Sequence, residues 1–209
     1  MTSAVELPDP AIPTGNTYDK YGASNPVVRR LMAGFERALG DLFGRARPES
    51  VLDVGCGEGV LTYRWAIELG SRPIVGIDLE DPKLQAEWAS RHRANLEFRT
   101  GRAESLACGD HEFDLVAAIE TLEHIPDPER AIAEMARVAR GHLLLSVPRE
   151  PLWRALNVAR GAYLRELGNT PGHLNHWSKR RFIELLSRHG EVVATRSPFP
   201  WTMALVRVA

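Results

Sequence analysis

The chain has 209 residues, of which 44% are hydrophobic and 25% are charged, and its formal net charge is -1 at pH 7. This length suits one α/β domain, and the near-neutral charge argues against a protein built to bind nucleic acid or an anionic membrane. No apolar run is long enough to span a bilayer, and residues 1–16 lack the features of a signal peptide. The only cysteines, Cys56 and Cys108, are too few for a disulfide framework, so we expect a cytoplasmic protein.

The N-terminal part of the chain divides into a tail and the start of a domain. Residues 1–16 are rich in Pro, Ser, Thr and Gly, and we expect them to form a flexible tail. Residues 17–209 are predicted to form a single domain. Its first helix is expected over about 27–43, where apolar residues recur at helical spacing. Tyr18 and Tyr21 lie just before this helix, where they are candidates for covering a bound ligand.

The stretch 51–59 contains the strongest local signal of the sequence. Its first residues, Val-Leu-Asp-Val, predict a short buried strand, and the glycines that follow predict a tight turn. From Val60 the apolar residues again recur at helical spacing. A strand, a glycine loop and a helix in this order direct backbone N–H groups and the positive helix end towards a polar group, so the loop is expected to bind a cofactor.

Strands and helices alternate through the rest of the chain. Further strands are predicted at 73–78, 95–100, 113–119, 142–147, 191–196 and 201–208. Helices are predicted after Asp81-Pro82, after Asp127-Pro128 with an end at Gly141, and after Ser178 with an end at Gly190. The last two strands, joined by a short turn, must pair antiparallel. The pattern predicts an α/β fold: a Rossmann-like, doubly wound sheet of seven strands, mostly parallel with an antiparallel last strand, and helices on both faces.

Residues 148–177 form an insertion between the fifth strand and the next helix. An amphipathic helix is predicted over 152–167, with Arg154, Arg160 and Arg165 between its apolar positions, followed by a loop at 168–172. We expect this insertion to cap the substrate. Its aromatic and basic residues are compatible with an aromatic or anionic substrate, and equally with a packed helix that has a solvated face.

Two aspartates narrow the choice of cofactor. Asp78 ends the second strand roughly 20 residues beyond the glycine loop, where doubly wound folds place a carboxylate that accepts hydrogen bonds from ribose hydroxyls. The alternative role, capping the next helix, is already available to Asp81. Asp53 lies inside the first strand, where it would repel a pyrophosphate but attract an ammonium group. This favours S-adenosylmethionine over a dinucleotide.

The combination of these motifs resembles the class I S-adenosylmethionine-dependent methyltransferases. Residues 53–59 resemble their motif I, Asp78 their ribose-binding acid, and residues 113–116 their fourth-strand motif. The resemblance implies a set of cofactor-binding residues: Asp53, Gly55, Cys56, Gly57, Asp78, Leu79, Ala103, Ile119 and Tyr21. Where many relatives have Gly-Asp-Ala after the third strand, this chain has Arg102 in the middle position, so backbone groups or Glu104 must contact the adenine.

A second motif begins where the fourth strand ends. Glu120, Glu123 and His124 are metal-ligand types spaced one turn apart. They resemble the Glu-x-x-Glu-His element of ubiquinone-pathway O-methyltransferases and of metal-dependent enzymes that methylate the 2′-hydroxyl of small RNAs. The RNA enzymes have a further His, for which His173 is the first choice here and His176 the second. This implies a divalent metal (Mg²⁺, Mn²⁺ or Zn²⁺) held by Glu120, Glu123, His124 and His173.

The same motif also occurs in related methyltransferases that need no metal. There the catalytic residues would be His124, acting as a base, and Glu123, or the loop would be purely structural. The predicted function is methyl transfer from S-adenosylmethionine to an oxygen or nitrogen of a small-molecule acceptor, without a nucleic-acid or membrane partner. The alternatives are 2′-O-methylation of RNA 3′ ends and, from other classes, a nicotinamide-dependent oxidoreductase or a non-catalytic cofactor-binding module.

Overall fold

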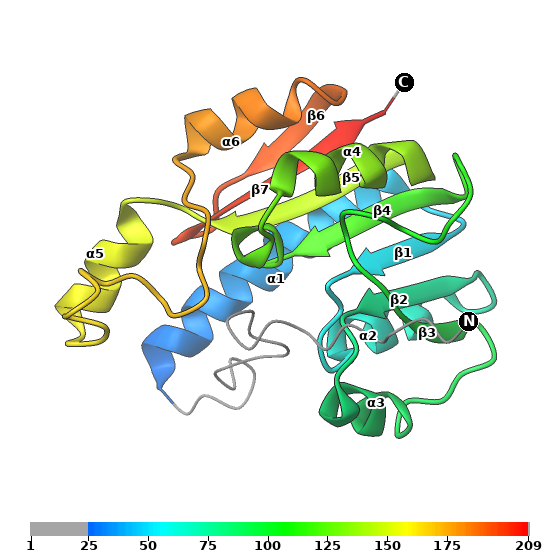
Figure 1. Cartoon of the computed structure of the whole chain (residues 1–209), viewed down its shortest axis with the longest axis horizontal. Helices are drawn as coiled ribbons and strands as arrows, with labels where there is room; N and C mark the ends of the chain where they lie inside the picture. Colours follow the sequence, from blue (N-terminus) through cyan, green and yellow to red (C-terminus); the bar gives the residue numbers. More distant parts are fainter. Residues whose placement is uncertain (1–24, 209) are drawn as a thin grey trace, which may run out of the picture.

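The computed structural model describes residues 25–208, which form one central sheet covered by helices (Figure 1). The strands are β1 (Val51–Val54), β2 (Ile74–Asp78), β3 (Leu96–Thr100), β4 (Phe113–Ile119), β5 (Ala139–Pro148), β6 (Glu191–Arg196) and β7 (Trp201–Arg207). The helices are α1 (Pro26–Ala46), α2 (Val60–Leu69), α3 (Pro82–Trp88), the short 3-10 helix η1 (Leu122–His124), α4 (Pro128–Val138), α5 (Leu152–Ala159) and α6 (Lys179–Leu186).

The strand order of the sheet is β3-β2-β1-β4-β5-β7-β6. The pairs from β3 across to β5 are parallel, whereas β7 runs antiparallel to both β5 and β6. The predicted seven-stranded, mostly parallel sheet with an antiparallel last strand is therefore confirmed. The order reverses between β1 and β4, and this is where open sheets of this kind bind their ligands.

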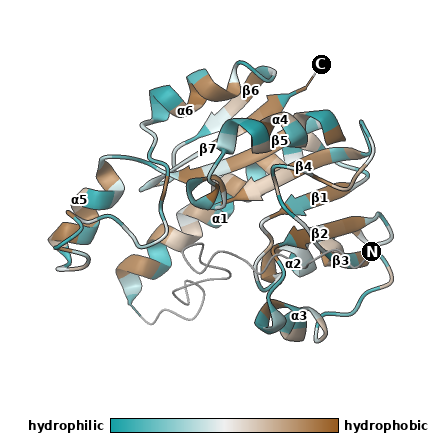
Figure 2. Cartoon of the chain, in the orientation of Figure 1, coloured by the Kyte–Doolittle hydropathy of each residue, from teal (hydrophilic) through white to brown (hydrophobic). Residues whose placement is uncertain are grey.

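Helices cover both faces of the sheet, as predicted. On one face, Phe35 and Leu42 of α1 and Trp65 of α2 belong to a buried apolar cluster. On the other face, Met135 of α4 and Phe182 of α6 belong to a second cluster. The strands between the two layers are hydrophobic, and the helices direct their hydrophilic residues outwards (Figure 2). Because helices cover both faces of the sheet, all four residues of β1 are buried. This explains why apolar and polar residues do not alternate along the strand.

Side-chain caps fix the beginnings of the predicted helices. Asn25 accepts a hydrogen bond from the Val27 N–H at the start of α1, and Asp81 caps α3. Asp127 and Ser178 cap α4 and α6 in the same way. Each cap accepts a backbone N–H that the helix itself cannot satisfy.

The ends of three predicted helices differ from the sequence-based expectation. Helix α4 ends at Val138, and Gly141 lies inside β5 rather than at a helix end. A Cβ atom at Gly141 would lie 2.8 Å from the Asp114 carbonyl oxygen, so glycine permits close strand packing there. Helix α5 ends at Ala159 instead of reaching 167, because the chain turns with positive φ at Gly161. Helix α6 ends at Leu186, before Gly190.

Two expectations concern residues outside the described range. The tail at 1–16 and the proposed lid residue Tyr21 both precede residue 25, where the description begins. Between residues 25 and 208, no helix combines the length and the apolarity that crossing a lipid bilayer would require.

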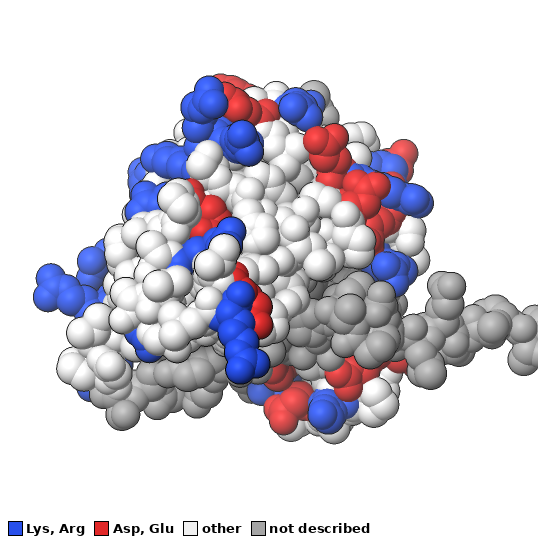
Figure 3. All heavy atoms as spheres, turned by 60° about the vertical axis from the view of Figure 1, so that its left-hand side comes forward, with Lys and Arg blue, Asp and Glu red and all other residues white. Residues whose placement is uncertain are grey.

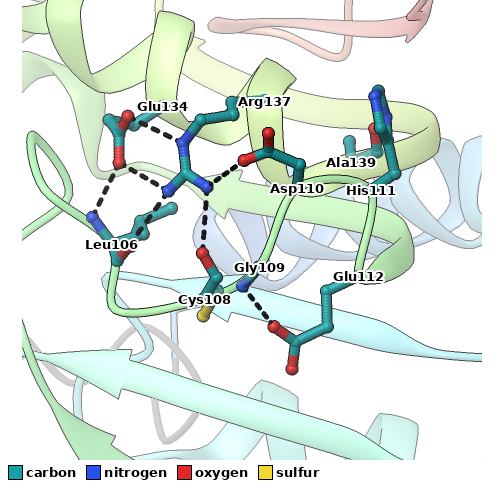
Figure 4. Close-up of polar contacts among 9 residues, drawn as sticks. All are labelled: Leu106, Cys108, Gly109, Asp110, His111, Glu112, Glu134, Arg137 and Ala139. Atoms are coloured by element: carbon teal, nitrogen blue, oxygen red, sulfur yellow. Dashed lines mark hydrogen bonds and ion pairs between the residues drawn. The ribbon is translucent and has the colours of Figure 1, made fainter.

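Arg137 of α4 makes several of the hydrogen bonds that attach the loop between β3 and β4 to this helix (Figure 4). The Arg137 guanidinium donates to the Asp110 carboxylate at 2.6 Å and to the carbonyl oxygens of Cys108 and Leu106 at 2.9 and 3.1 Å. It also pairs with Glu134, whose carboxylate in turn accepts the Leu106 N–H at 3.0 Å. The planar guanidinium has five N–H donors in fixed directions, which match these carboxylate and carbonyl acceptors. A lysine ammonium could not reach them all.

We predict that Arg137→Met lowers the free energy of unfolding by about 2 kcal/mol, because several charge-assisted hydrogen bonds are lost together. Urea denaturation followed by circular dichroism measures this change. The matched control is Arg180→Met, which removes an ion pair to Glu184 whose side chains are 81% and 56% exposed and should cost little. Equal losses of stability in the two variants would contradict the role of Arg137.

Candidate functional site

A cavity of about 640 Å³ lies at the carboxyl edge of the sheet. The ends of β1, β2 and β4 and the glycine loop after β1 line one part of it. The N-terminal half of α1, helix α5 and the beginning of β7 line the opposite part. The cavity therefore has a half that belongs to the sheet and a half that belongs largely to the insertion at 148–177.

Backbone contacts hold the glycine loop in a tight turn. The N–H groups of Gly55 and Cys56 donate to the Ile77 carbonyl oxygen at 2.7 and 3.1 Å. Gly55 has φ of +73°, and a Cβ atom there would overlap the Thr121 side chain. Glycine is therefore required at position 55 both by the backbone conformation and by the close approach of the loop after β4.

Trp88 supports this loop from below, a role that the sequence analysis missed. Its indole N–H donates to the Gly57 carbonyl oxygen at 2.8 Å, and its ring stacks on Phe98 with centroids 5.2 Å apart. The available signal was the chemistry of tryptophan, since a buried indole N–H needs an acceptor. Sequence alone does not indicate which acceptor, because Trp88 and Gly57 are 31 positions apart.

Asp78 lies at the end of β2, on the wall of the cavity. Its two carboxylate oxygens accept the N–H groups of Gly57 and Leu79, each at 2.7 Å. Burial raises the pKa of Asp78, while these two hydrogen bonds oppose the rise. The loop, the carboxylate and Leu79 are thus assembled at one place, as the spacing predicts.

Asp53 is only 2% exposed, although it also lines the cavity. Its carboxylate accepts the Thr62 hydroxyl at 2.7 Å. Burial raises the pKa of Asp53 to about 7; the Thr62 hydrogen bond opposes the shift, and the charge of Asp78 adds to it. A nearby cation would favour the ionised form of this carboxyl group.

Two further predicted cofactor residues lie on the same cavity wall. Ala103 and Ile119 line the cavity, together with Arg102 and Glu104. The Arg102 guanidinium lies 3.7 Å from the Glu104 carboxylate, so the residue that departs from the family pattern pairs with the acid predicted to replace it at the adenine.

The second motif forms η1 and directs His124 into the cavity. The Nδ1 atom of His124 lies 2.8 Å from the carbonyl oxygen of Gly172. A carbonyl oxygen only accepts, so Nδ1 carries the proton and the neutral ring has its lone pair on Nε2. This tautomer makes Nε2 suited to bind a metal or to accept a proton.

Three of the four predicted metal ligands come together. Glu123, His124 and His173 each offer a ligand atom, and these atoms lie within 4.8 Å of one another. The fourth, Glu120, is not part of this group; it accepts the Ser146 hydroxyl at 2.8 Å. His176, the second choice from sequence, is exposed, and its Nε2 atom contacts Asn169.

Besides the Gly172–His124 contact, hydrogen bonds from Leu174 and Asn175 tie the end of the insertion to η1 and to Ile125, the residue after it. The N–H groups of Leu174 and Asn175 donate to the Glu123 carbonyl oxygen at 2.8 and 3.1 Å. The Asn175 amide donates to the carbonyl oxygens of Ile125 and Leu122 at 2.7 and 3.2 Å. Asn175, which the sequence analysis did not single out, thus helps to hold His173 opposite His124.

Aromatic rings line the insertion side of the cavity. Phe35 and Trp201 meet edge to face with centroids 4.9 Å apart, and Trp153 lies 5.8 Å from Trp201. Trp153 also stacks on His173 at 6.2 Å. Phe35, Trp153 and Trp201 therefore give the part of the cavity formed by α1, α5 and β7 a strongly aromatic surface.

Known proteins resemble this chain in sequence, and others resemble it in fold. A family model described as a methyltransferase domain matches residues 52–145. The ubiquinone biosynthesis O-methyltransferase of Alkalilimnicola ehrlichii is 32% identical over 194 residues, covering 83% of this chain and 75% of the relative. The corresponding enzyme of Methylococcus capsulatus is 30% identical over 182 residues, covering 78% and 73%.

The fold agrees with a solved structure from a more distant protein. The structure of magnesium protoporphyrin IX methyltransferase from Synechocystis, with bound S-adenosylhomocysteine, covers 90% of both chains with a TM-score of 0.63 at 16% identity. The relatives named above are methyltransferases, and a nicotinamide-dependent oxidoreductase is not favoured. The chain therefore belongs to the S-adenosylmethionine-dependent methyltransferases.

Proposed function

We propose that this enzyme methylates a hydroxyl oxygen of a small, largely apolar acceptor. The observation that carries the proposal is that one cavity is lined by the two aspartates at the ends of β1 and β2, by His124 of η1 and by several aromatic rings. The O-methyltransferase names of its relatives favour oxygen over nitrogen as the methylated atom. Detection of methyl transfer to small aromatic hydroxyl compounds by mass spectrometry tests the proposal.

The residues on the sheet side fit S-adenosylmethionine. We assign the ammonium of its amino-acid part to Asp53, and its ribose hydroxyls to Asp78, next to Leu79. The backbone of the glycine loop (Gly55, Cys56 and Gly57), Ala103 and Ile119 would complete the contacts on this wall. When bound, this cofactor supplies a methyl group on an electrophilic sulfonium, so the protein chiefly aligns the acceptor and assists loss of its proton.

His124 is assigned to the acceptor proton. Its Nε2 atom, made basic by the hydrogen bond from Nδ1 to Gly172, can accept that proton directly. In a second proposed arrangement, Glu123, His124 and His173 would bind a divalent cation. One carboxylate and two imidazoles favour Zn²⁺ or Mn²⁺ over Mg²⁺, and such a cation would lower the pKa of an acceptor hydroxyl.

The insertion at 148–177 is proposed to select the acceptor. It contributes Trp153 and His173 to the cavity, and it contacts η1 through Asn175. The face seen in Figure 3 has basic residues along its margins and also in its middle, with acidic residues beside many of them. An acceptor of small size and apolar character suits this distribution better than an RNA end, which would require a continuous basic track.

We predict that Asp78→Ala weakens binding of S-adenosylhomocysteine by about 10- to 100-fold, the range expected when hydrogen bonds to a carboxylate are lost. Isothermal titration calorimetry gives the dissociation constant. Glu80→Ala, which removes an exposed charge two residues away, is the matched control and should bind normally. Unchanged affinity of the Asp78 variant would remove this residue from the cofactor site.

We predict that the affinity for S-adenosylhomocysteine rises about tenfold between pH 6 and pH 7.5, because its ammonium requires Asp53 to be ionised and the pKa of Asp53 is about 7. Below pH 7 the free protein holds a proton on Asp53, and cofactor binding must release it. Above pH 7 Asp53 is already ionised, so the affinity no longer depends on pH through this group. Calorimetry across this range measures the slope. The Asp53→Asn variant should bind weakly with no slope, and a flat profile in the unaltered enzyme would contradict the assignment.

We predict that His124→Ala lowers kcat by about 10²- to 10⁴-fold, the usual contribution of a proton-transferring group, while cofactor affinity is unchanged. Full activity of this variant would exclude His124 from the mechanism. Chelation then separates the two proposed roles. Loss of activity that Zn²⁺ or Mn²⁺ restores supports the metal, whereas retained activity assigns His124 as the base.

Metal analysis of the purified protein provides an independent readout of the same site. The His173→Ala variant should lose bound metal, and the exposed His176→Ala variant should retain it.

A further inference from the structure

The hydroxyl group of Thr170 accepts two hydrogen bonds within the wall of the insertion. The Trp153 indole N–H donates to the Thr170 Oγ1 atom at 2.9 Å, and the Asn157 amide donates to the same atom at 3.1 Å. The orientation of the Asn157 amide is fixed, because its nitrogen also lies 2.8 Å from the Gly168 carbonyl oxygen, which can only accept. An indole N–H is likewise a donor only.

These contacts determine the direction of the hydroxyl proton. A hydroxyl group has two acceptor positions and one donor hydrogen, and both acceptor positions of Thr170 are taken. Within residues 25–208, the Thr170 side chain makes no hydrogen bond besides these two. The O–H must therefore point away from Trp153 and Asn157, in the remaining direction about the oxygen atom.

Thr170 lines the same cavity as the cofactor-side aspartates. Its neighbours on this wall include Trp153, Leu156 and Trp201, whose cavity surfaces are largely apolar. An oriented donor beside apolar side chains is a usual means by which a pocket selects the orientation of its ligand. The buried Asn157, which is 3% exposed, keeps this donor rigid by joining α5 to the loop at 168–170.

We propose that Thr170 is a specificity-determining residue that donates a hydrogen bond to a second oxygen of the acceptor molecule. This inference rests on the proposed function and names the class of acceptor more closely. The acceptor is an aromatic hydroxyl compound with an ether, carbonyl or carboxylate oxygen besides the hydroxyl that is methylated. An analogue without that oxygen would leave the Thr170 hydrogen without an acceptor on the ligand, and it binds more weakly for that reason.

The test compares two probes of nearly equal shape, 2-methoxyphenol and 2-ethylphenol, which differ by an ether oxygen in place of a methylene group. Their binding to the complex of the enzyme with S-adenosylhomocysteine is measured by calorimetry. We expect the unaltered enzyme to bind 2-methoxyphenol about tenfold more tightly, as for one neutral hydrogen bond. Thr170→Val should abolish this preference, and Thr170→Ser, which keeps the hydroxyl, should restore it.

A matched control checks for general effects of replacing threonine by valine. The hydroxyl of Thr202 in β7 is buried and has no hydrogen-bond partner among the described residues, and Thr202 does not line the cavity. Thr202→Val should therefore retain the preference for 2-methoxyphenol. Loss of the preference in this control would show that it does not report on Thr170.

Three results would overturn the role of Thr170: equal binding of the two probes, equal weakening of both by Thr170→Val, or binding of neither probe. Each of these concerns acceptor binding alone. The proposed function fails separately, if no small hydroxyl compound receives a methyl group from S-adenosylmethionine while the cofactor itself still binds.

Discussion

The reversal of strand order between β1 and β4 is the constraint on which the site depends. From β1 the chain continues through α2 to β2 on one side, and from β4 it continues through α4 to β5 on the other. Because both connections leave the same edge, α2 and α4 cover opposite faces and the space between the two loops stays open. The glycine loop and the residue that leads into η1 meet at this edge, where Thr121 packs against Gly55, and the proposed cofactor and acceptor positions lie beside them.

The hydrogen bond between Gly172 and His124 joins the two halves of the cavity. The insertion contributes the carbonyl oxygen that fixes the His124 tautomer, and its next residue, His173, faces the His124 ring at 4.9 Å. Trp153 and Thr170 belong to the same insertion. The residues proposed to recognise the acceptor are therefore close in sequence to those that orient His124, the proposed base. A change in the insertion is therefore expected to alter acceptor choice and proton transfer together, even where it does not touch the cofactor.

The features that the sequence predicts correctly are those set by interactions between residues near each other in the chain. The strand-loop-helix at 51–59, the position of Asp78 and the capping residues are dictated by local backbone chemistry, and the structure has them as predicted. The early end of α5 and the position of Gly141 inside β5 depend on tertiary packing. Helical periodicity and the presence of a glycine therefore gave the wrong ends for these two helices. Trp88 and Thr170 act through contacts with residues distant in sequence, which a single sequence does not specify.

Asp53 shows why a local inconsistency can be the best functional signal in a sequence. A carboxylate in the middle of a buried parallel strand weakens the fold, since burial raises its pKa to about 7 and the free protein becomes less stable as pH rises towards that value. A valine would pack there without this cost. The hydrogen bond that its side chain makes within the described residues comes from the neutral hydroxyl of Thr62. The proposed ammonium of the cofactor would supply the missing positive charge, so the acid that local rules disfavour is the residue on which the proposed cofactor assignment depends.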